Sequence, residues 1–168
     1  MKNGEKFNLY WGNVMNDYME IANHLAYENL KTKVGGPFGA CIVKDGKVIS
    51  SSSNHVILNH DPTAHAEILA IREAGKILQT HDLSGCELYT TCYPCPMCMA
   101  AILWANIRVV YYGNTKEDAD KIGFRDDFIY SFFQTLPNSC EITFHQIHRE
   151  DTIKAFQEYA KDSEKVIY

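Results

Sequence analysis

The stretches "DPTAHAEILA" at residues 61–70 and "TCYPCPMCMA" at residues 91–100 place metal-binding side chains next to prolines. Asp61 followed by Pro62 predicts a helix start, with Asp61 as the N-cap and Pro62 as the first helical residue. Pro96 predicts the start of a second helix in the same way. The two stretches therefore predict two helix starts that carry residues able to hold a metal.

The second stretch contains a Cys-x-x-Cys pair, Cys95 and Cys98. Free backbone N–H groups and the positive end of the helix dipole lower the pKa of a thiol there and favour the metal-binding thiolate. His65, close to the first helix start, adds an imidazole. One histidine and two cysteines leave the fourth tetrahedral position of a zinc ion for water, which is typical of catalytic zinc rather than structural zinc.

Glu67 follows His65 by two residues, which on a regular helix separates their side chains by about 200°. The two side chains converge only if the helix end itself points into the site. Glu67 can then act as a general base and afterwards as a general acid. A lone Cys-x-x-Cys also occurs in redox sites and structural zinc knuckles, so only the combination of both stretches indicates a zinc hydrolase.

The bulk composition narrows the class of protein. The 168 residues have the usual length of one domain, so we expect a single domain over residues 1–168. The formal net charge of −5 disfavours nucleic acid as a partner, because phosphate binding needs clustered Lys and Arg. With no run of 18 apolar residues and no secretory signal, we expect a cytoplasmic protein without a membrane partner, whose six cysteines are thiols or metal ligands.

Hydrophobic periodicity predicts helices that alternate with strands, which favours one sheet covered by helices. Asp45-Gly46 is a good two-residue turn for a hairpin. The expected elements are a helix over 14–30, a hairpin over 35–56, a helix from 62 to 78, a strand over 86–91, a helix from 96, a strand over 107–113, short helices over 118–121 and 127–133, a last strand over 142–148 and a last helix over 152–160.

The pattern H-x-E…P-C-x-x-C is the signature of the zinc nucleobase deaminases, and the chain resembles the cytidine deaminase superfamily. Within it, the chain is similar to the bacterial guanine deaminases. The segments that carry the resemblance run from about residue 35 to the C-terminus and are "GGPFGACIVKDG", "NHDPTAHAEI", "CPMCMAAILWA" and "GFRDDFIY". The last of these segments, with the terminal Tyr168, favours guanine as the substrate.

The resemblance implies a three-layer α/β/α fold around a central mixed sheet of five strands. It implies one zinc ion per subunit, held by His65, Cys95 and Cys98, with Glu67 as the proton shuttle. It also implies a homodimer, in which the C-terminal segment can cross to the partner subunit.

The resemblance further implies a purine pocket formed by Asn54, the backbone of Ala66, Phe38, Trp104, Asp126 and Tyr168. Asn54 and Ala66 would hydrogen-bond the base, Phe38 and Trp104 would form apolar walls, and Tyr168 would close the site. A physical reason supports Asp126. Guanine presents N1–H and its exocyclic amine as neighbouring donors, which one carboxylate can accept together, and a buried acceptor left unpaired by another base costs about 1–3 kcal/mol.

Some residues near the motifs have alternative interpretations. Relatives usually carry Glu where this chain has Tyr93, which leaves the zinc ligands intact but bears on the pocket rim. Cys92 is an extra thiol that could compete as a ligand, and Asp127 could replace Asp126 in the base contact. His55 and His60 flank the site in sequence, but we expect both to have structural roles, because the ligand count is already complete.

The function expected from these features is the zinc-dependent conversion of guanine to xanthine with release of ammonia. Cytosine, a nucleoside such as guanosine, and adenosine in tRNA remain alternative substrates. A non-catalytic module with structural zinc is the alternative outside the enzymes, and it predicts a fourth protein ligand.

Overall fold

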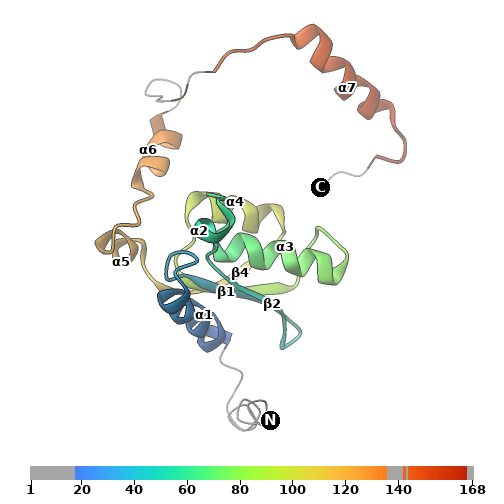
Figure 1. Ribbon diagram of the computed structural model, residues 1–168. Helices are drawn as coiled ribbons and strands as arrows, with labels where there is room; N and C mark the ends of the chain where they lie inside the picture. Colours follow the sequence, from blue (N-terminus) through green and yellow to red (C-terminus); the bar gives the residue numbers. More distant parts are fainter. Residues whose placement is uncertain (1–17, 136–141, 143, 166–168) are drawn as a thin grey trace. The chain divides into compact units, whose positions relative to one another are not determined.

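A computed structural model of the protein describes residues 18–135, 142 and 144–165 (Figure 1). The chain divides into two units, Met1–Asp126 and Asp127–Tyr168. The single domain expected over residues 1–168 stays a prediction.

The first unit contains one mixed sheet of four strands, in the order β2-β1-β3-β4. β1 pairs antiparallel with both β2 and β3, whereas β3 and β4 are parallel. Asp45 and Gly46 both have positive φ in the turn between β1 and β2, as a tight hairpin turn requires. The predicted hairpin is therefore confirmed. The strands are β1 (Gly39–Lys44), β2 (Lys47–Ser53), β3 (Cys86–Cys92) and β4 (Val109–Asn114).

Helices cover both faces of this sheet, so the first unit has three layers (Figure 1). Helix α1 (Tyr18–Thr32) covers one face, and α3 (Ala66–Leu78) and α4 (Pro96–Trp104) cover the other. A Cβ on Gly39 would lie 2.0 Å from the carbonyl oxygen of Ala22, so the close approach of α1 to β1 requires glycine there. The expected three-layer α/β/α arrangement is confirmed.

The core of the first unit lies between the sheet and helices α3 and α4. Three alanines of α3 are fully buried, and their small side chains let the helix backbone pack close to the strands. The fully buried residues of this core include Ala40, Ile42, Ala66, Ala70, Ala74, Leu83, Leu88, Ile102 and Ile107.

The start of α3 differs from the prediction that Asp61 is its N-cap. The helix begins at Ala66, and His65 is the N-cap residue, with extended backbone angles. The carboxylate of Asp61 instead accepts hydrogen bonds from the backbone N–H and the hydroxyl of Thr63, at 2.8 and 2.7 Å. This local turn competes with helix formation, because short polar side chains can satisfy the backbone outside a helix. A short helix that was not predicted, α2 (Val56–Asn59), precedes it.

The expected fifth strand over residues 142–148 is wrong for the part of that segment that the structure describes. Residue 142 and residues 144–148 form no strand, and the side chains of Ile142, Phe144 and Ile147 are exposed. Their spacing resembles that of a strand, but a strand needs a hydrogen-bonded neighbour as well as a suitable pattern. The remaining helices are α5 (Lys116–Lys121), α6 (Asp127–Thr135) and α7 (Arg149–Lys161).

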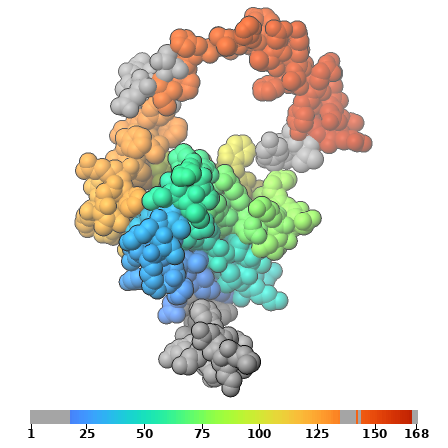
Figure 2. Space-filling model, in the orientation of Figure 1, coloured from blue at the N-terminus to red at the C-terminus, as the bar shows by residue number. Residues whose placement is uncertain are grey.

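The second unit exposes large apolar side chains on its helices. Phe128 and Phe133 of α6 and Phe156 of α7 are all mostly exposed, and α7 is drawn in red in Figure 2. An apolar helix face of this kind is typical of a surface that packs against another element. No helix within the described ranges has the length and apolar character needed to cross a membrane.

Candidate metal centre and active site

Two helix N-termini meet in the first unit and bring His65, Cys95 and Cys98 together. His65 is the N-cap of α3, Cys95 is the N-cap of α4, and Cys98 lies in the first turn of α4. The Nδ1 atom of His65 lies 3.6 Å from each of the two sulfur atoms. The three ligand atoms all lie within 4.8 Å of one another, and they form the group of His, Cys, Asp and Glu side chains in the described residues that could hold a metal.

These distances fit a tetrahedral zinc ion. Zinc binds sulfur at about 2.3 Å and nitrogen at about 2.0–2.1 Å, so two ligands at a tetrahedral angle lie about 3.5–3.8 Å apart. The observed separations of 3.6 Å between nitrogen and sulfur match this spacing. Cys92 is not part of the group, and its thiol instead donates to the carbonyl oxygen of Thr115 at 3.5 Å. Among the described residues, Cys92 therefore does not compete for a place in the group of three ligand atoms.

The electrostatics of the cluster favour metal binding. A hydrogen bond from the Cys98 thiol lowers the pKa of Cys95 to about 4, and hydrogen bonds from His65 and from the backbone N–H of Cys98 add to the effect. The same thiol–thiol pair raises the pKa of Cys98. The hydrogen bond with Cys95 raises the pKa of His65, although burial opposes it. One thiolate is therefore already favoured, and the positions of both sulfur atoms suit a cation.

The carboxyl group of Glu67 lies beside this cluster. Its Oε1 accepts a hydrogen bond from the hydroxyl of Thr90 at 3.1 Å, and its Oε2 lies 3.5 Å from the sulfur of Cys98. Glu67 is only 6% exposed, and this burial raises the pKa of its carboxyl group. His65 and Glu67 share the site because His65 is an extended N-cap residue, outside the regular helix that would separate them.

The loop from β3 into α4 is held by the end of β4. The backbone N–H of Tyr93 donates to the carbonyl oxygen of Asn114 at 2.8 Å, and the Asn114 side chain donates to the carbonyl oxygen of Thr91 at 2.8 Å. These parallel neighbours fix the chain just before Cys95. Asn114, the last residue of β4, therefore helps to orient the start of α4.

Asn54 lies at the end of β2, close to the segment that carries His65. The backbone N–H of the adjacent His55 donates to the carbonyl oxygen of Ala64 at 2.9 Å. The side-chain oxygen of Asn54 accepts hydrogen bonds from the N–H groups of Gly36 and Val56, at 3.3 and 3.2 Å. Two N–H donors on one atom identify it as the amide oxygen, so the NH₂ group of Asn54 is the end that remains to donate.

Phe38 belongs to the same side of the fold. Its backbone carbonyl accepts from the N–H of Asn54 at 3.0 Å, and its ring makes an edge contact with Phe124 at 4.8 Å between centroids. A Cβ on Gly36 would lie 2.8 Å from both rings, so glycine is needed to accommodate them. Ala66 is fully buried as the first residue of α3, where its backbone N–H has no acceptor within the helix.

The other expected pocket residues have different positions. The pKa of Cys92 is raised to about 11. Burial is the main cause, and the negative charges of Glu67 and Asp126 add to it. The charge of Asp126 therefore reaches the thiol of Cys92, three residues before the ligand Cys95. Trp104 is 69% exposed at the C-terminal end of α4, roughly 13 Å along the helix from Cys95, so the structure does not bring it to the cluster of its own chain. Tyr168 lies outside the described residues.

The residues with alternative interpretations have other positions in the fold. His55 shares a hydrogen bond with the hydroxyl of Ser53 at 3.2 Å, and His60 ends α2 in a left-handed conformation. Tyr93 makes an edge contact with Tyr112, 5.1 Å between ring centroids. Neither histidine belongs to the metal-binding group found among the described residues.

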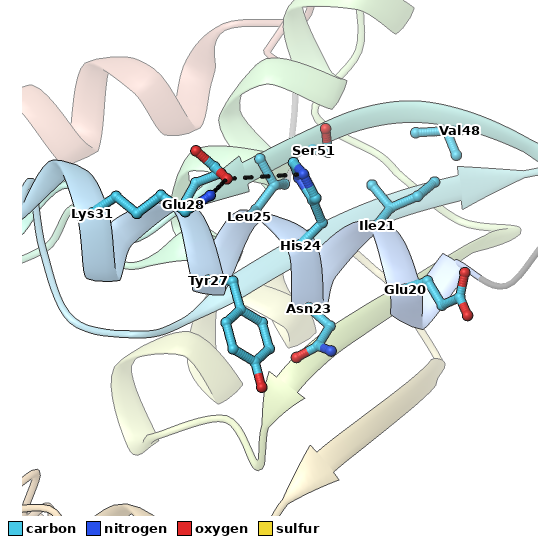
Figure 3. Close-up of a pocket in the computed structure, with 10 residues that line it drawn as sticks. All are labelled: Glu20, Ile21, Asn23, His24, Leu25, Tyr27, Glu28, Lys31, Val48 and Ser51. Atoms are coloured by element: carbon cyan, nitrogen blue, oxygen red, sulfur yellow. Dashed lines mark hydrogen bonds and ion pairs between the residues drawn. The ribbon is translucent and has the colours of Figure 1, made fainter. Parts of the chain in front are cut away.

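An open pocket of about 840 Å³ lies elsewhere, between α1 and β2 (Figure 3). It contains none of the residues of the metal cluster. Its lining includes an ion pair between Lys31 and Glu28 at 2.7 Å and a longer contact between Glu28 and His24 at 3.9 Å. This pocket is therefore separate from the candidate active site.

The sequence interpretation missed three residues that the structure places at or beside the site: Thr90, Asn29 and Phe124. Thr90 is an inward-facing polar residue in a strand, and Asn29 is a polar residue on the apolar face of an amphipathic helix. A polar residue in such a position is a sign of a specific buried hydrogen bond. Phe124 carried no comparable signal.

Residues 13–114 match the family model of the cytidine and deoxycytidylate deaminase zinc-binding region, which spans more than half of the chain and includes the whole cluster. The chain belongs to this family. The expected family membership, the zinc cofactor and the class of zinc-dependent deaminase are thereby confirmed.

Several known deaminases are similar to this chain in sequence or in structure. The chain is 42% identical to the guanine deaminase of Bacillus subtilis over 90% of this chain and 97% of that protein, whose X-ray structure matches with a TM-score of 0.85. A guanine deaminase structure from Nitrosomonas europaea matches at 34% identity and a TM-score of 0.62, over 65% of this chain and 63% of that chain. A tRNA-specific adenosine deaminase of Aquifex aeolicus is 51% identical over 45% of this chain and 50% of that protein.

Proposed function

We propose that this protein hydrolyses guanine to xanthine and ammonia. The observation that carries the proposal is the meeting of Glu67 with the three ligand atoms at two helix N-termini. The similarity to the Bacillus subtilis guanine deaminase supports the choice of substrate, because it extends over nearly the whole length of both chains.

His65, Cys95 and Cys98 would hold the zinc ion. When bound, zinc supplies a Lewis acid that lowers the pKa of a coordinated water to about 7. Three protein ligands leave room for that water, whereas a structural zinc site would have four. Within the described residues the cluster has three members, which supports an enzyme over a non-catalytic zinc module.

Glu67 would move the protons. Burial raises the pKa of its carboxyl group, and its Oε2 lies beside the ligand atoms, so the group is placed to accept a proton and return it. It would take a proton from the attacking water and deliver it to the ring nitrogen of guanine, and a second transfer would release the amine as ammonia. The water oxygen replaces the amine on the purine, so guanine and water give xanthine and ammonia.

The base would be held by residues around the cluster. The amide NH₂ of Asn54 and the backbone N–H of Ala66 would donate to acceptor atoms of the purine, and Phe38 would pack against its ring. The carboxylate of Asp126 would accept N1–H and the exocyclic amine, since its charge already acts on Cys92 beside the cluster. Trp104 would contact the base only in the site of a partner subunit. Tyr168 would contact the base only if the C-terminal segment reaches a site.

We further propose a homodimer in which the C-terminal segment contacts the partner subunit. The exposed apolar side chains of Phe128, Phe133 and Phe156 support this proposal, because such faces are typical of association surfaces. Sedimentation should give the mass of two chains, and Phe156→Glu should shift it toward one chain. A wild-type protein that stays monomeric at micromolar concentration would reject the dimer.

Ammonia release from the zinc-loaded protein tests the proposed function. Guanine, guanosine, cytosine, cytidine, adenine and adenosine should be compared at equal concentration, and guanine should be the preferred substrate. The partial similarity to a tRNA-specific adenosine deaminase makes tRNA the second candidate substrate, to be tested by inosine formation. The net charge of −5 disfavours tRNA, and inosine formation without guanine turnover would overturn the proposal.

A further inference from the structure

Asn29 is a buried polar residue on the face of α1 that packs against the sheet. It shares this face with Ala22 and Ala26 and is only 2% exposed. A buried amide is costly unless its hydrogen bonds are formed. Helix α1 carries none of the cluster residues, so the hydrogen bonds of Asn29 must hold other segments in place.

The amide nitrogen of Asn29 bridges two separate segments. It donates to the carbonyl oxygen of Gly36 at 2.8 Å and to the carbonyl oxygen of Asn54 at 2.7 Å. Gly36 lies in the loop that precedes β1, and Asn54 follows β2. One side chain therefore uses both of its N–H groups to tie the loop before the hairpin to the residue after it.

The same two segments fix the orientation of the Asn54 side chain. Its amide oxygen accepts from the N–H groups of Gly36 and Val56. A Cβ on Gly35 would lie 2.2 Å from the Asn54 carbonyl oxygen and 2.3 Å from its side-chain oxygen, so the loop packs directly on Asn54. No fully buried side-chain nitrogen or oxygen among the described residues lacks a hydrogen bond. The amide nitrogen of Asn54 has no partner among those residues, so this nitrogen is not fully buried.

We infer that Asn29 is a positioning residue, which holds the loop and the backbone of Asn54 so that the Asn54 amide presents its NH₂ group to the purine. Asn54 is 4% exposed, and the N–H group of Gly36 is one of the two donors, with that of Val56, that orient its amide oxygen. Loss of Asn29 releases the carbonyl of Gly36 and with it the adjacent N–H donor. The inference rests on the proposed contact between Asn54 and the base, and adds a residue from outside the catalytic elements.

A double-mutant cycle tests this role through catalytic efficiency. Asn29→Ala should lower kcat/KM for guanine by about tenfold, the effect of one lost hydrogen bond, mainly through a higher KM. Asn54→Ala should lower it by at least as much. The double variant should be no worse than Asn54→Ala, because both changes remove one interaction. Fold-changes that multiply in the double variant, or an unchanged kcat/KM in Asn29→Ala, would overturn the inference.

Two control variants separate positioning from general stability. Ser50→Ala removes another buried hydrogen bond, from the Ser50 hydroxyl to the Ala70 carbonyl at 2.7 Å, and should lower the melting temperature without changing KM. Glu28→Gln changes the neighbouring residue on the outer face of α1, where Glu28 pairs with Lys31 (Figure 3), and should leave both quantities near wild type. If Ser50→Ala raises KM as much as Asn29→Ala, the effect is one of stability and the inference fails.

A crystal structure of the variant gives a readout that does not depend on turnover. In Asn29→Ala, or in Asn29→Ser if the alanine variant does not fold, the Asn54 amide should rotate or lose its contact with the Gly36 N–H. An unchanged Asn54 amide would overturn the inference, whatever the kinetics. If wild-type protein fails to deaminate guanine while the Asn54 amide still moves, the proposed function fails and the positioning role of Asn29 stands.

Discussion

The hydroxyl of Thr90, on β3, donates a hydrogen bond to Oε1 of Glu67, on α3, across 3.1 Å. Thr90 is 1% exposed, so water does not compete for this bond. The other carboxyl oxygen, Oε2, faces Cys98 at 3.5 Å. The sheet therefore holds one oxygen of the candidate proton shuttle and leaves the other turned toward the metal cluster.

Replacement of Thr90 by valine should lower kcat with little change in KM. Valine keeps the shape of threonine but leaves Oε1 unpaired, and one hydrogen bond to a charged group corresponds to roughly a tenfold or larger effect on rate. Steady-state kinetics on guanine measure the split. Thr90→Ser keeps the hydroxyl and should retain most of the activity; a serine variant as slow as the valine variant would argue against this role.

Replacement of Cys95 by serine should remove zinc and lower stability together. A bound metal stabilises the folded state in proportion to the logarithm of its concentration over its Kd, so loss of a ligand lowers the melting temperature in zinc-containing buffer. Metal analysis of the purified variant and thermal unfolding with and without chelator measure both effects. Cys92→Ser is the matched control and should keep its zinc, because Cys92 bonds to Thr115 instead. Full zinc content in Cys95→Ser would refute the ligand assignment.

Replacement of Asp126 by alanine should reduce guanine turnover far more than it reduces stability. The carboxylate would otherwise accept two donors of the base, and each unpaired donor costs about 1–3 kcal/mol. The matched control is Asp127→Ala, one residue further on at the start of α6. If the control loses turnover and Asp126→Ala keeps it, Asp127 is the residue that binds the base.

The buried thiol of Cys41 should make the protein less stable at alkaline pH. Burial raises its pKa from the usual value of 9.0 to about 12. Between these values the unfolded chain loses the proton and the folded chain keeps it, so the free energy of unfolding falls as pH rises through this window. Urea unfolding from pH 8 to 11 should show a shallower fall for Cys41→Ala, by at most about 1.4 kcal/mol per pH unit. Identical slopes for both proteins would exclude a contribution from Cys41.

Local motifs allowed much of the site to be predicted from the sequence. Cys95 and Cys98 are three residues apart at a proline-initiated helix, so their proximity follows from helix geometry alone. The hairpin followed in the same way from Asp45-Gly46. The meeting of His65 with this pair could be expected only from the resemblance to a family, because thirty residues and a strand separate them.

Features that depend on competition between local and tertiary contacts were not predicted. Asp is a residue type favoured at N-caps, but the hydrogen bonds that Asp61 accepts from Thr63 form a turn, and the helix begins at Ala66. Residues 142–148 have the spacing of a strand without a strand neighbour in the described part of the chain. The hydrogen bonds of Thr90 and Asn29 join segments far apart in sequence, so the local pattern can indicate a buried polar residue but not its partner.

Ammonia release by Glu67→Gln, measured together with its zinc content, tests the central claim most directly. Glutamine keeps the size of the side chain but cannot carry the proton, and proton transfer by a positioned side chain contributes about 100-fold or more to the rate. We expect one zinc ion per chain, as in the wild-type protein, and at least a 100-fold lower rate of guanine deamination. Undiminished turnover by a variant that retains its zinc would contradict the claim.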